Sequence, residues 1–335
     1  MIEVARLNQM ENGGAMRRTI HFHVVLCFAA LVACAKEKSA ADSTTGKPTG
    51  ATTAAAAAAA DKIGETSGMK VPESVRYDPE LDVFYVSNVN GNPSQKDNNG
   101  FIARVRADST NVVTMLVEGG KKGVTLNAPK GSALKGDTLF VADIDALRAF
   151  NRRTGAPIRS VSLVAQKATF LNDVAVGGDG AIYITDTGIV FDAKGGMTHP
   201  GVNRIFKVVG TTVSEAAKGD SLNNPNGITW DAARSRFVLA PFAGPSVQTW
   251  TPGHNPTMLV SGPGQYDGVE VLTGSGNILV SSWADSAVHV IRGGSTMSAL
   301  VKNVSAPADI GVDTKRNVLA VPRFNDGKVE YFRIP

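Results

Sequence analysis

The amino-acid sequence predicts an all-β fold, a six-bladed β-propeller that occupies residues 61–335. A strand–turn–strand pattern recurs six times in this region, and further short strands follow each copy at intervals of about 42 residues. The composition agrees with this prediction, since 43% of the residues are hydrophobic, 19% are charged and 35 are glycines. A turn-rich chain of this length can form one large β domain.

The recurring unit is a β-hairpin. Apolar residues alternate with polar ones on both sides of an Asp-Pro, Gly-Asp, Asp-Gly or Gly-Asn turn, which is the usual pattern of a half-buried hairpin. The six copies begin at Pro72, Ala128, Leu171, Asn224, Tyr266 and Pro307.

Each hairpin is followed by a third strand and, in most copies, a fourth. We predict third strands at Phe101–Val105, Leu147–Asn151, Arg204–Val208, Ser246–Trp250, Ala287–Ile291 and Lys328–Phe332. Fourth strands are predicted at Met115–Glu118, Ile158–Leu163, Thr257–Val260 and Ala299–Lys302, with the weakest pattern near Val213–Ala217.

The sixth unit has only three strands before the sequence reaches Pro335. An unpaired edge strand is an aggregation hazard that folded proteins avoid. Residues Lys62–Thr66 precede the first copy at the distance where other units have their fourth strand. We therefore expect Lys62–Thr66 to complete the sixth blade and close the ring.

Two spacers, residues 90–100 and 188–203, interrupt the regular interval between second and third strands. Both are rich in glycine and asparagine. They are either lids over a site or neutral insertions on the rim.

The N-terminal segment predicts export. Arg17-Arg18 precedes an apolar stretch, residues 24–33, that is too short to span a bilayer and ends in Leu-Val-Ala-Cys34, a sequence that resembles the bacterial lipobox. Cys34 would then carry lipid and anchor the protein in the cell envelope, at the outer membrane facing the periplasm. An ordinary signal peptide or a buried apolar strand are the alternatives. Residues 35–60 are polar and of low complexity, which predicts a flexible tether.

Several chemistries are excluded by composition and motif. The net charge is only +4, and no basic stripe with interleaved aromatic residues indicates a nucleic-acid partner. The two cysteines both lie in the N-terminal segment, so the propeller has no disulfide. No Gly-x-Ser-x-Gly motif or P-loop is present. The propeller contains three histidines, His199, His254 and His289. Their spacing is not that of a zinc site.

The start of each innermost strand is the predicted functional position. In a propeller these positions meet at one mouth of the central channel, although they are about one repeat apart in the sequence. They are occupied by Glu73, Lys130, Asn172 with Asp173, Asn226, Asp267 and Asp309. Carboxylate and carboxamide oxygens are the ligands that Ca²⁺ and Mg²⁺ prefer, which predicts a divalent cation on the axis. The alternative is a set of Asx-turns repeated in every blade.

Four segments at these positions resemble one known family, the senescence-marker-protein, gluconolactonase and luciferin-regenerating-enzyme propellers. They are PESVRYDP from Pro72, FLNDVAV from Phe170, NNPNGITW from Asn223 and YDGVEVLTGSGNILVSSW from Tyr266. The resemblance spans residues 71–335.

The resemblance implies one divalent cation, Ca²⁺ first and Mg²⁺, Mn²⁺ or Zn²⁺ as alternatives. Its direct ligands would be Glu73, Asn226 and Asp267. Asn172, with Asp173 beside it, would contact the substrate or metal-bound water. Asp267 would also be the general base in lactone hydrolysis.

The sequence departs from the family pattern at two places. Phe170 stands where the family's lactonases usually have an arginine that holds substrate oxygens, and Glu73-Ser74-Val75 replaces the usual Glu-Gly-Pro.

The sequence therefore leaves two candidate functions. The first is a metal-dependent hydrolase of a lactone or related cyclic ester, acting on a small molecule. The second is a non-catalytic envelope propeller of the NHL type, serving as a binding or sensor module for a protein partner. Trp283 is the tryptophan whose spacing places it near the axis.

Overall fold

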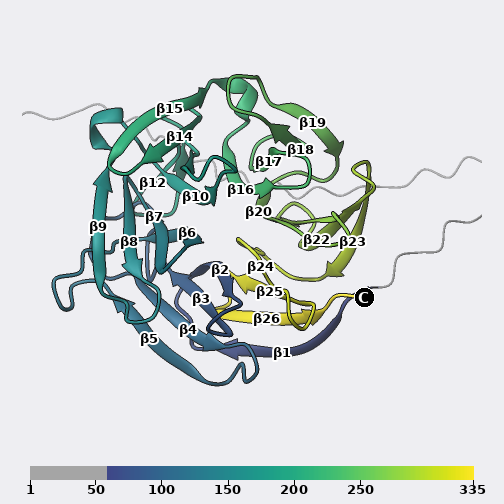
Figure 1. Ribbon diagram of the computed structural model, residues 1–335, viewed down its shortest axis with the longest axis horizontal. Helices are drawn as coiled ribbons and strands as arrows, with labels where there is room; N and C mark the ends of the chain where they lie inside the picture. Colours follow the sequence, from purple (N-terminus) through teal and green to yellow (C-terminus); the bar gives the residue numbers. More distant parts are fainter. Residues whose placement is uncertain (1–58) are drawn as a thin grey trace, which may run out of the picture. The chain divides into compact units, whose positions relative to one another are not determined.

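The computed structural model describes residues 59–335, which form a six-bladed β-propeller with every blade a four-stranded antiparallel sheet (Figure 1). The predicted fold class and blade number are confirmed. The signal segment, Cys34 and all but the last two residues of the predicted tether lie outside the described residues. Within residues 59–335, no helix has the length and apolar character needed to cross a membrane.

The first three blades contain consecutive strands apart from one inserted hairpin. Blade 1 is β2 (Pro72–Asp78), β3 (Val83–Asn88), β4 (Phe101–Arg106) and β5 (Val113–Glu118). Blade 2 is β6 (Pro129–Lys135), β7 (Thr138–Asp143), β8 (Ala146–Asn151) and β9 (Pro157–Ser162). Blade 3 is β10 (Leu171–Val176), β11 (Ile182–Asp186), β14 (Arg204–Val209) and β15 (Thr212–Lys218). Strand β15 is regular, although its sequence pattern is weak.

Blades 4 and 5 repeat the arrangement, and two short 3₁₀ helices, η1 (Val164–Gln166) and η2 (Asp220–Leu222), lie between blades. Blade 4 is β16 (Pro225–Asp231), β17 (Arg236–Pro241), β18 (Ser246–Trp250) and β19 (Thr257–Ser261). Blade 5 is β20 (Tyr266–Val271), β21 (Ile278–Ser282), β22 (Ala287–Arg292) and β23 (Thr296–Lys302).

Blade 6 joins the two ends of the described chain. It consists of β24 (Gly311–Asp313), β25 (Val318–Arg323), β26 (Lys328–Arg333) and the N-terminal β1 (Asp61–Ser67). β1 pairs antiparallel with β26, so the purple and yellow ends of the ribbon lie side by side in Figure 1. The hydroxyls of Thr66 and Tyr331 are hydrogen-bonded at 2.9 Å. The predicted closure by residues 62–66 is confirmed.

The hydrophobic core is divided among the contacts between neighbouring blades. Blades 3 and 4 meet through the rings of Tyr183, Phe237 and Trp250, with the Tyr183 and Phe237 centroids 4.6 Å apart. Blades 6 and 1 meet in the same way, through Tyr331 and Phe84 at 5.5 Å. Because every blade packs against two others, closure of the ring leaves no blade face exposed.

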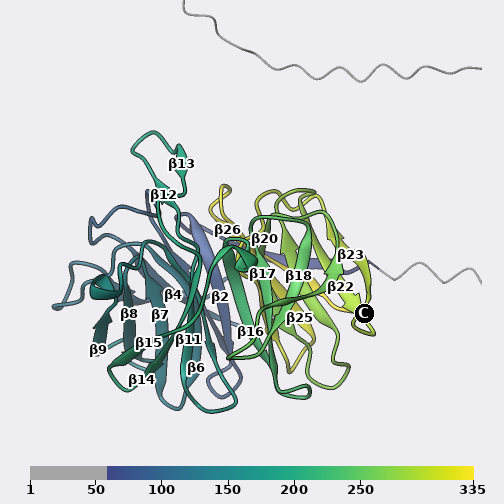
Figure 2. The ribbon, with the colours of Figure 1, turned by 90° about the horizontal axis from the view of Figure 1, so that it is seen from above.

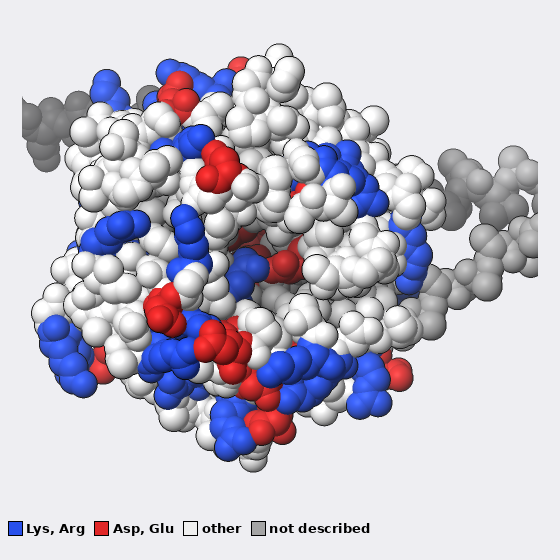
Figure 3. Space-filling view, in the orientation of Figure 1, with Lys and Arg blue, Asp and Glu red and all other residues white. Residues whose placement is uncertain are grey.

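Ion pairs between blades supplement this packing. The Arg152 guanidinium of blade 2 lies 2.7 Å from the buried Asp78 carboxylate of blade 1, and Arg316 of blade 6 lies 2.6 Å from Asp82. On the face shown in Figure 3, basic and acidic residues are interleaved, and both colours appear in the central hollow.

The two spacers contact each other above one face. Residues Val190–Phe191 (β12) and Met197–Thr198 (β13) form a separate hairpin that stands above the blades in Figure 2. The Phe191 amide donates to Ser94 Oγ at 2.9 Å, and Asn92 Nδ2 donates to the Asp192 carbonyl at 2.6 Å. The two spacers are therefore joined to each other by hydrogen bonds on this face.

We predict that β1 contributes several kcal/mol to stability, because its removal breaks a ladder and exposes the edge of β26. A chain that starts at Gly68 should melt at least about 10 °C below one that starts at Ala59, and it should aggregate. Calorimetry and light scattering measure both effects. Equal melting temperatures would show that the ring does not need this strand.

Candidate functional site

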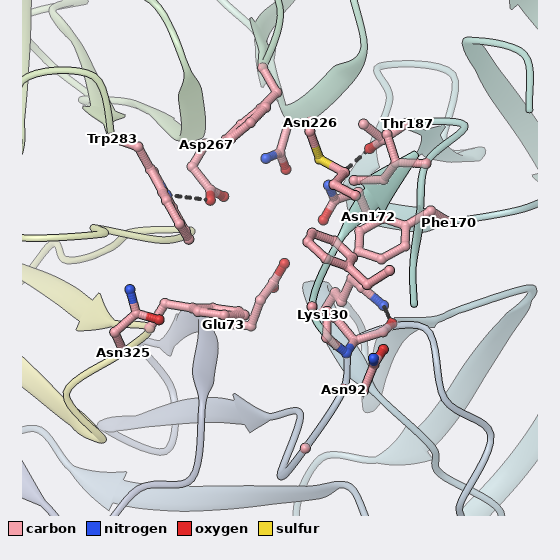
Figure 4. Close-up of a pocket in the computed structure, with 18 of the residues that line it drawn as sticks. Glu73, Asn92, Lys130, Phe170, Asn172, Thr187, Asn226, Asp267, Trp283 and Asn325 are labelled. Carbon is pink, nitrogen blue, oxygen red and sulfur yellow. Dashed lines mark hydrogen bonds between the residues drawn. The ribbon is translucent and has the colours of Figure 1, made fainter. Parts of the chain in front are cut away.

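Four of the predicted residues line one cavity at a mouth of the central channel. The cavity has a volume of about 610 Å³, and its lining includes Glu73, Asn172, Asn226 and Asp267. Each comes from a different blade, through β2, β10, β16 and β20. Figure 4 shows the side chains of Glu73, Asn226 and Asp267 directed toward a common centre.

A break in strand register accounts for this convergence. Pairing of the innermost strand with its neighbour shifts between Pro72 and Ser74, and again between Pro225 and Gly227. Equivalent shifts enclose Asn172 and Asp267. Because a β-bulge bends the strand and redirects a side chain, each bulge turns one polar residue out of the blade and into the channel.

Glycines allow the innermost strands to approach closely around the axis. A Cβ atom on Gly227 would lie 2.2 Å from the carbonyl oxygen of Asp267, and one on Gly268 would lie 2.4 Å from the backbone nitrogen of Ile310. Neither contact is sterically allowed. In each Asn-Gly or Asp-Gly pair, the first residue therefore directs its side chain into the channel. The second must be glycine because a side chain there would collide with the next blade.

Glu73 is a buried carboxylate with one oxygen, Oε2, that has no hydrogen-bond partner. Burial raises the pKa of Glu73 well above its usual value, and the nearby Asp267 carboxylate raises it further. Lys130 acts in the opposite direction but does not reverse the shift. An ionised Glu73 is therefore costly unless another positive charge lies close to it.

Asp267 is buried in the same way. Trp283 Nε1 donates to Asp267 Oδ2 at 2.9 Å, whereas Oδ1 has no partner. Burial raises the pKa of Asp267 well above its usual value, with a further contribution from Asp309, while the hydrogen bond from Trp283 lowers it. Trp283, which sequence spacing placed near the axis, thus orients the predicted general base.

Asn172 and Asp173 are adjacent in sequence but have different contacts. Thr187 Oγ1 donates to the Pro225 carbonyl at 2.8 Å, so it accepts from Asn172 Nδ2 at 2.9 Å. This hydrogen bond leaves the Asn172 carboxamide oxygen free for the cavity. Asp173 does not line the cavity, since its carboxylate accepts the backbone amides of Val174 at 2.7 Å and Ile228 at 2.8 Å. It joins blade 3 to blade 4.

The oxygen set fits a hard divalent cation. Two buried carboxylates each present an unpartnered oxygen, and two carboxamides, Asn172 and Asn226, lie beside them. Within residues 59–335, no three or more His, Cys, Asp and Glu side chains gather as metal ligands. Ligation here would therefore depend on the carboxamides, which Ca²⁺ accepts readily. The Asx-turn alternative describes other residues, such as Asp313, which accepts the amide of Lys315 at 2.8 Å.

Lys130 is a residue of the site to which the sequence assigned no role. It lines the cavity from β6, and its ammonium lies 4.2 Å from the ring centre of Phe170. Its Nζ donates to the carbonyls of Pro93 and Ala128, both at 3.0 Å, which leaves one of its three hydrogens. Burial lowers the pKa of Lys130 to about 8, against the opposing effect of Glu73. A cation therefore lies beside Phe170, where the family pattern has arginine.

The sequence analysis also did not predict two of the aromatic residues around the mouth. Besides Trp283, the cavity is lined by Phe242 and Phe324, which directly follow the second strands of blades 4 and 6. The signal was present in the repeat itself, because Trp283 occupies the same place in blade 5. Aligning the copies one residue beyond the second strand would have found all three.

No protein-family model matches the chain, and no curated protein sequence matches it. Several solved structures share its fold. The chain is similar to regucalcin from Agrobacterium tumefaciens, a calcium-binding protein, with a TM-score of 0.62 and 14% identity over 83% of this chain and 96% of that one.

Two enzymes show the same likeness. A gluconolactonase from Xanthomonas campestris has a TM-score of 0.56 and 14% identity over 80% of this chain and 88% of that one. A luciferin-regenerating enzyme has a TM-score of 0.58 and 14% identity over 82% and 94%. The chain shares their fold. The resemblance inferred from the four motifs is thus confirmed for the propeller architecture.

We predict that the Glu73 carboxylate destabilises the cation-free protein at neutral and higher pH. An unfolded glutamate has a pKa of about 4.3, and burial raises that of folded Glu73, so the folded protein holds more protons between the two values. The free energy of unfolding therefore falls as pH rises through that window.

Glu73→Gln should remove this loss of stability at high pH. In EDTA at pH 8 the variant should be more stable than wild type by at least about 1 kcal/mol, and the difference should vanish near pH 4. Urea unfolding at both pH values measures it, with the exposed Glu118→Gln as control. A variant less stable than wild type at pH 8 would contradict the prediction.

Proposed function

We propose that this protein is a divalent-cation-dependent hydrolase of a lactone or related cyclic ester. The observation that carries the proposal is the pair of buried carboxylates, Glu73 and Asp267, whose unpartnered oxygens face one cavity from different blades. The likeness to a calcium-binding regucalcin and to a gluconolactonase supports it.

Glu73, Asn226 and Asp267 would hold the cation, with Asn172 directed at the substrate. When bound, the cation would supply a Lewis acid that polarises the ester carbonyl and would compensate the buried negative charge. Ca²⁺ is the favoured ion because all three candidate ligands are oxygen atoms, one of them from a carboxamide.

Asp267 is suited to remove a proton from the attacking water. Trp283 fixes the orientation of this carboxylate through Oδ2, which leaves Oδ1 for the cation, and Oδ2 can accept a second hydrogen bond from the water. The water oxygen bonds to the carbonyl carbon as Asp267 Oδ2 takes the proton. The ring carbon–oxygen bond then breaks, and the leaving oxygen receives that proton, which yields a hydroxy acid.

Lys130 and Asn172 would orient the substrate. The third ammonium hydrogen of Lys130 can be donated to a substrate oxygen, and the free carboxamide oxygen of Asn172 can accept a hydroxyl or a water proton. Lys130 would in this way replace the arginine that is missing at Phe170.

A non-catalytic binding propeller is the second candidate. Phe170 favours it, because the residue that would grip a lactone in the related enzymes is absent from its usual place. For either function we propose that Cys34 carries a lipid anchor and that the propeller works at the cell envelope.

We predict that Asp267→Asn lowers kcat/KM for lactone hydrolysis by about 100- to 10,000-fold, the range expected when a general base is removed. The same substitution should weaken Ca²⁺ binding, because it deletes a charged ligand. A pH-indicator assay and titration calorimetry measure the two effects, with the exposed Asp108→Asn as matched control.

The two candidate functions separate in this experiment. Wild type that binds Ca²⁺ but opens no lactone would support the binding module. Wild type that binds neither Ca²⁺, Mg²⁺, Mn²⁺ nor Zn²⁺ would exclude the proposed hydrolase. Unchanged activity in Asp267→Asn would remove Asp267 as the base.

A further inference from the structure

Three aromatic side chains form one wall of the cavity, and they occupy the same place in three consecutive blades. Phe242, Trp283 and Phe324 each follow directly after the second strand of their blade. Their backbone amides make one repeated hydrogen bond across the innermost strand, to the carbonyls of Asn224 at 2.9 Å, Gln265 at 3.0 Å and Ala306 at 3.1 Å. The wall is therefore a property of the repeat.

The three rings form a continuous surface. The centroids of Phe242 and Trp283 are 6.0 Å apart, and those of Trp283 and Phe324 are 5.5 Å apart. All three side chains are only partly buried. Large apolar side chains kept partly exposed side by side at the mouth of a cavity indicate a binding surface for an apolar ligand.

The opposite wall is apolar as well, and the rim hairpin builds it. Phe170 and Phe191 have ring centroids 5.8 Å apart, and Met197 is 51% exposed yet lines the cavity. Phe191 and Met197 face each other across β12 and β13. Hydrogen bonds between the 90–100 loop and residues Phe191 and Asp192 hold this hairpin at the cavity mouth.

The charged groups of the lining, Glu73, Lys130 and Asp267, come from the starts of the innermost strands. Two uncharged polar side chains, Asn92 and Asn325, lie farther out around the cavity in Figure 4. A ligand with hydroxyls around its whole ring would bury several of them against aromatic faces that offer no hydrogen bond, which is costly. A ligand with one polar end and an apolar body would place its ester beside the charged groups and its body between the two walls. The volume of about 610 Å³ is that of a small-molecule site.

We propose that the site takes a lactone or cyclic ester that carries an aryl or alkyl substituent of about four to eight carbons, and that it discriminates against polyhydroxylated sugar lactones. This inference rests on the proposed function, since it names the substrate class of that same site. The two aromatic walls are the specificity-determining elements.

Three lactones with the same six-membered ring test it: glucono-δ-lactone, unsubstituted δ-valerolactone and δ-decalactone, which bears a pentyl chain. With the full chain in Ca²⁺ buffer, kcat/KM for δ-decalactone should exceed that for the other two by about 100-fold, because the chain is buried between the walls. Equal or greater activity on glucono-δ-lactone would overturn the inference while leaving the proposed hydrolase intact.

Binding supplies a readout that does not depend on turnover. The lactam 6-pentylpiperidin-2-one resists hydrolysis, and it should bind at least about 30-fold more tightly than piperidin-2-one. If the pentyl lactam binds in this way but no lactone is opened, the apolar ligand class stands and the hydrolase does not. If the two lactams bind equally, or neither binds, the apolar ligand class fails.

Variants of the rim hairpin locate the effect. Phe191→Ser and Met197→Ser should each reduce the preference for δ-decalactone over δ-valerolactone by about five- to tenfold. Both residues lie on a partly exposed hairpin outside the blades, so folding should survive, and circular dichroism checks it. Met258→Ser, at a methionine that is 68% exposed on the outermost strand of blade 4 and does not line the cavity, is the control. An unchanged preference in both hairpin variants would remove this wall from the proposal.

Discussion

The close approach of the innermost strands around the channel axis is the constraint on which the rest of the site depends. Gly227 and Gly268 lie against the backbone of the next blade, where a Cβ atom would not fit. In blade 3 the equivalent position holds Asp173, whose carboxylate accepts the Ile228 amide of blade 4. The bulge at each strand start directs the preceding residue into the channel. The bulge and the glycine that follows it thus account both for the close approach of the strands and for the convergence of Asn226 and Asp267.

That convergence has an electrostatic cost. Burial raises the pKa values of Glu73, Asp267 and Asp309, and each carboxylate lies in the field of another. Arg76 pairs with Glu270, donates to the Ser132 carbonyl at 2.8 Å and offsets only part of the burial effect on Asp309. The proposed cation, bound at the mouth of the channel, would stabilise this excess of carboxylates as well as take part in the proposed chemistry.

The sequence predicted the features that recur in every repeat, but it did not predict the contacts that depend on packing between blades. Blade number, the closing strand and the four cavity residues followed from the spacing of the copies. The different contacts of Asn172 and Asp173 did not, because a bulge decides which neighbour enters the channel. The approach of Lys130 to Phe170 joins two blades, and no pattern within one copy records it. The wall at Trp283 could have been found, since it is encoded in the repeat.

The proposed cation ligands and the proposed specificity residues occupy different positions in the repeat, and Phe170 belongs with the second group because its ring packs against Phe191. The candidate cation ligands lie at strand starts, where bulges and glycines tolerate little change. The walls lie after the second strands and on the rim hairpin, where the chain is free to vary. An arginine at position 170 would place a second cation beside Lys130 and a charge against Phe191. A phenylalanine at this position agrees with the apolar substrate body proposed above. The residue that departs from the sugar-lactonase pattern would therefore contact the same part of the substrate as the aromatic walls.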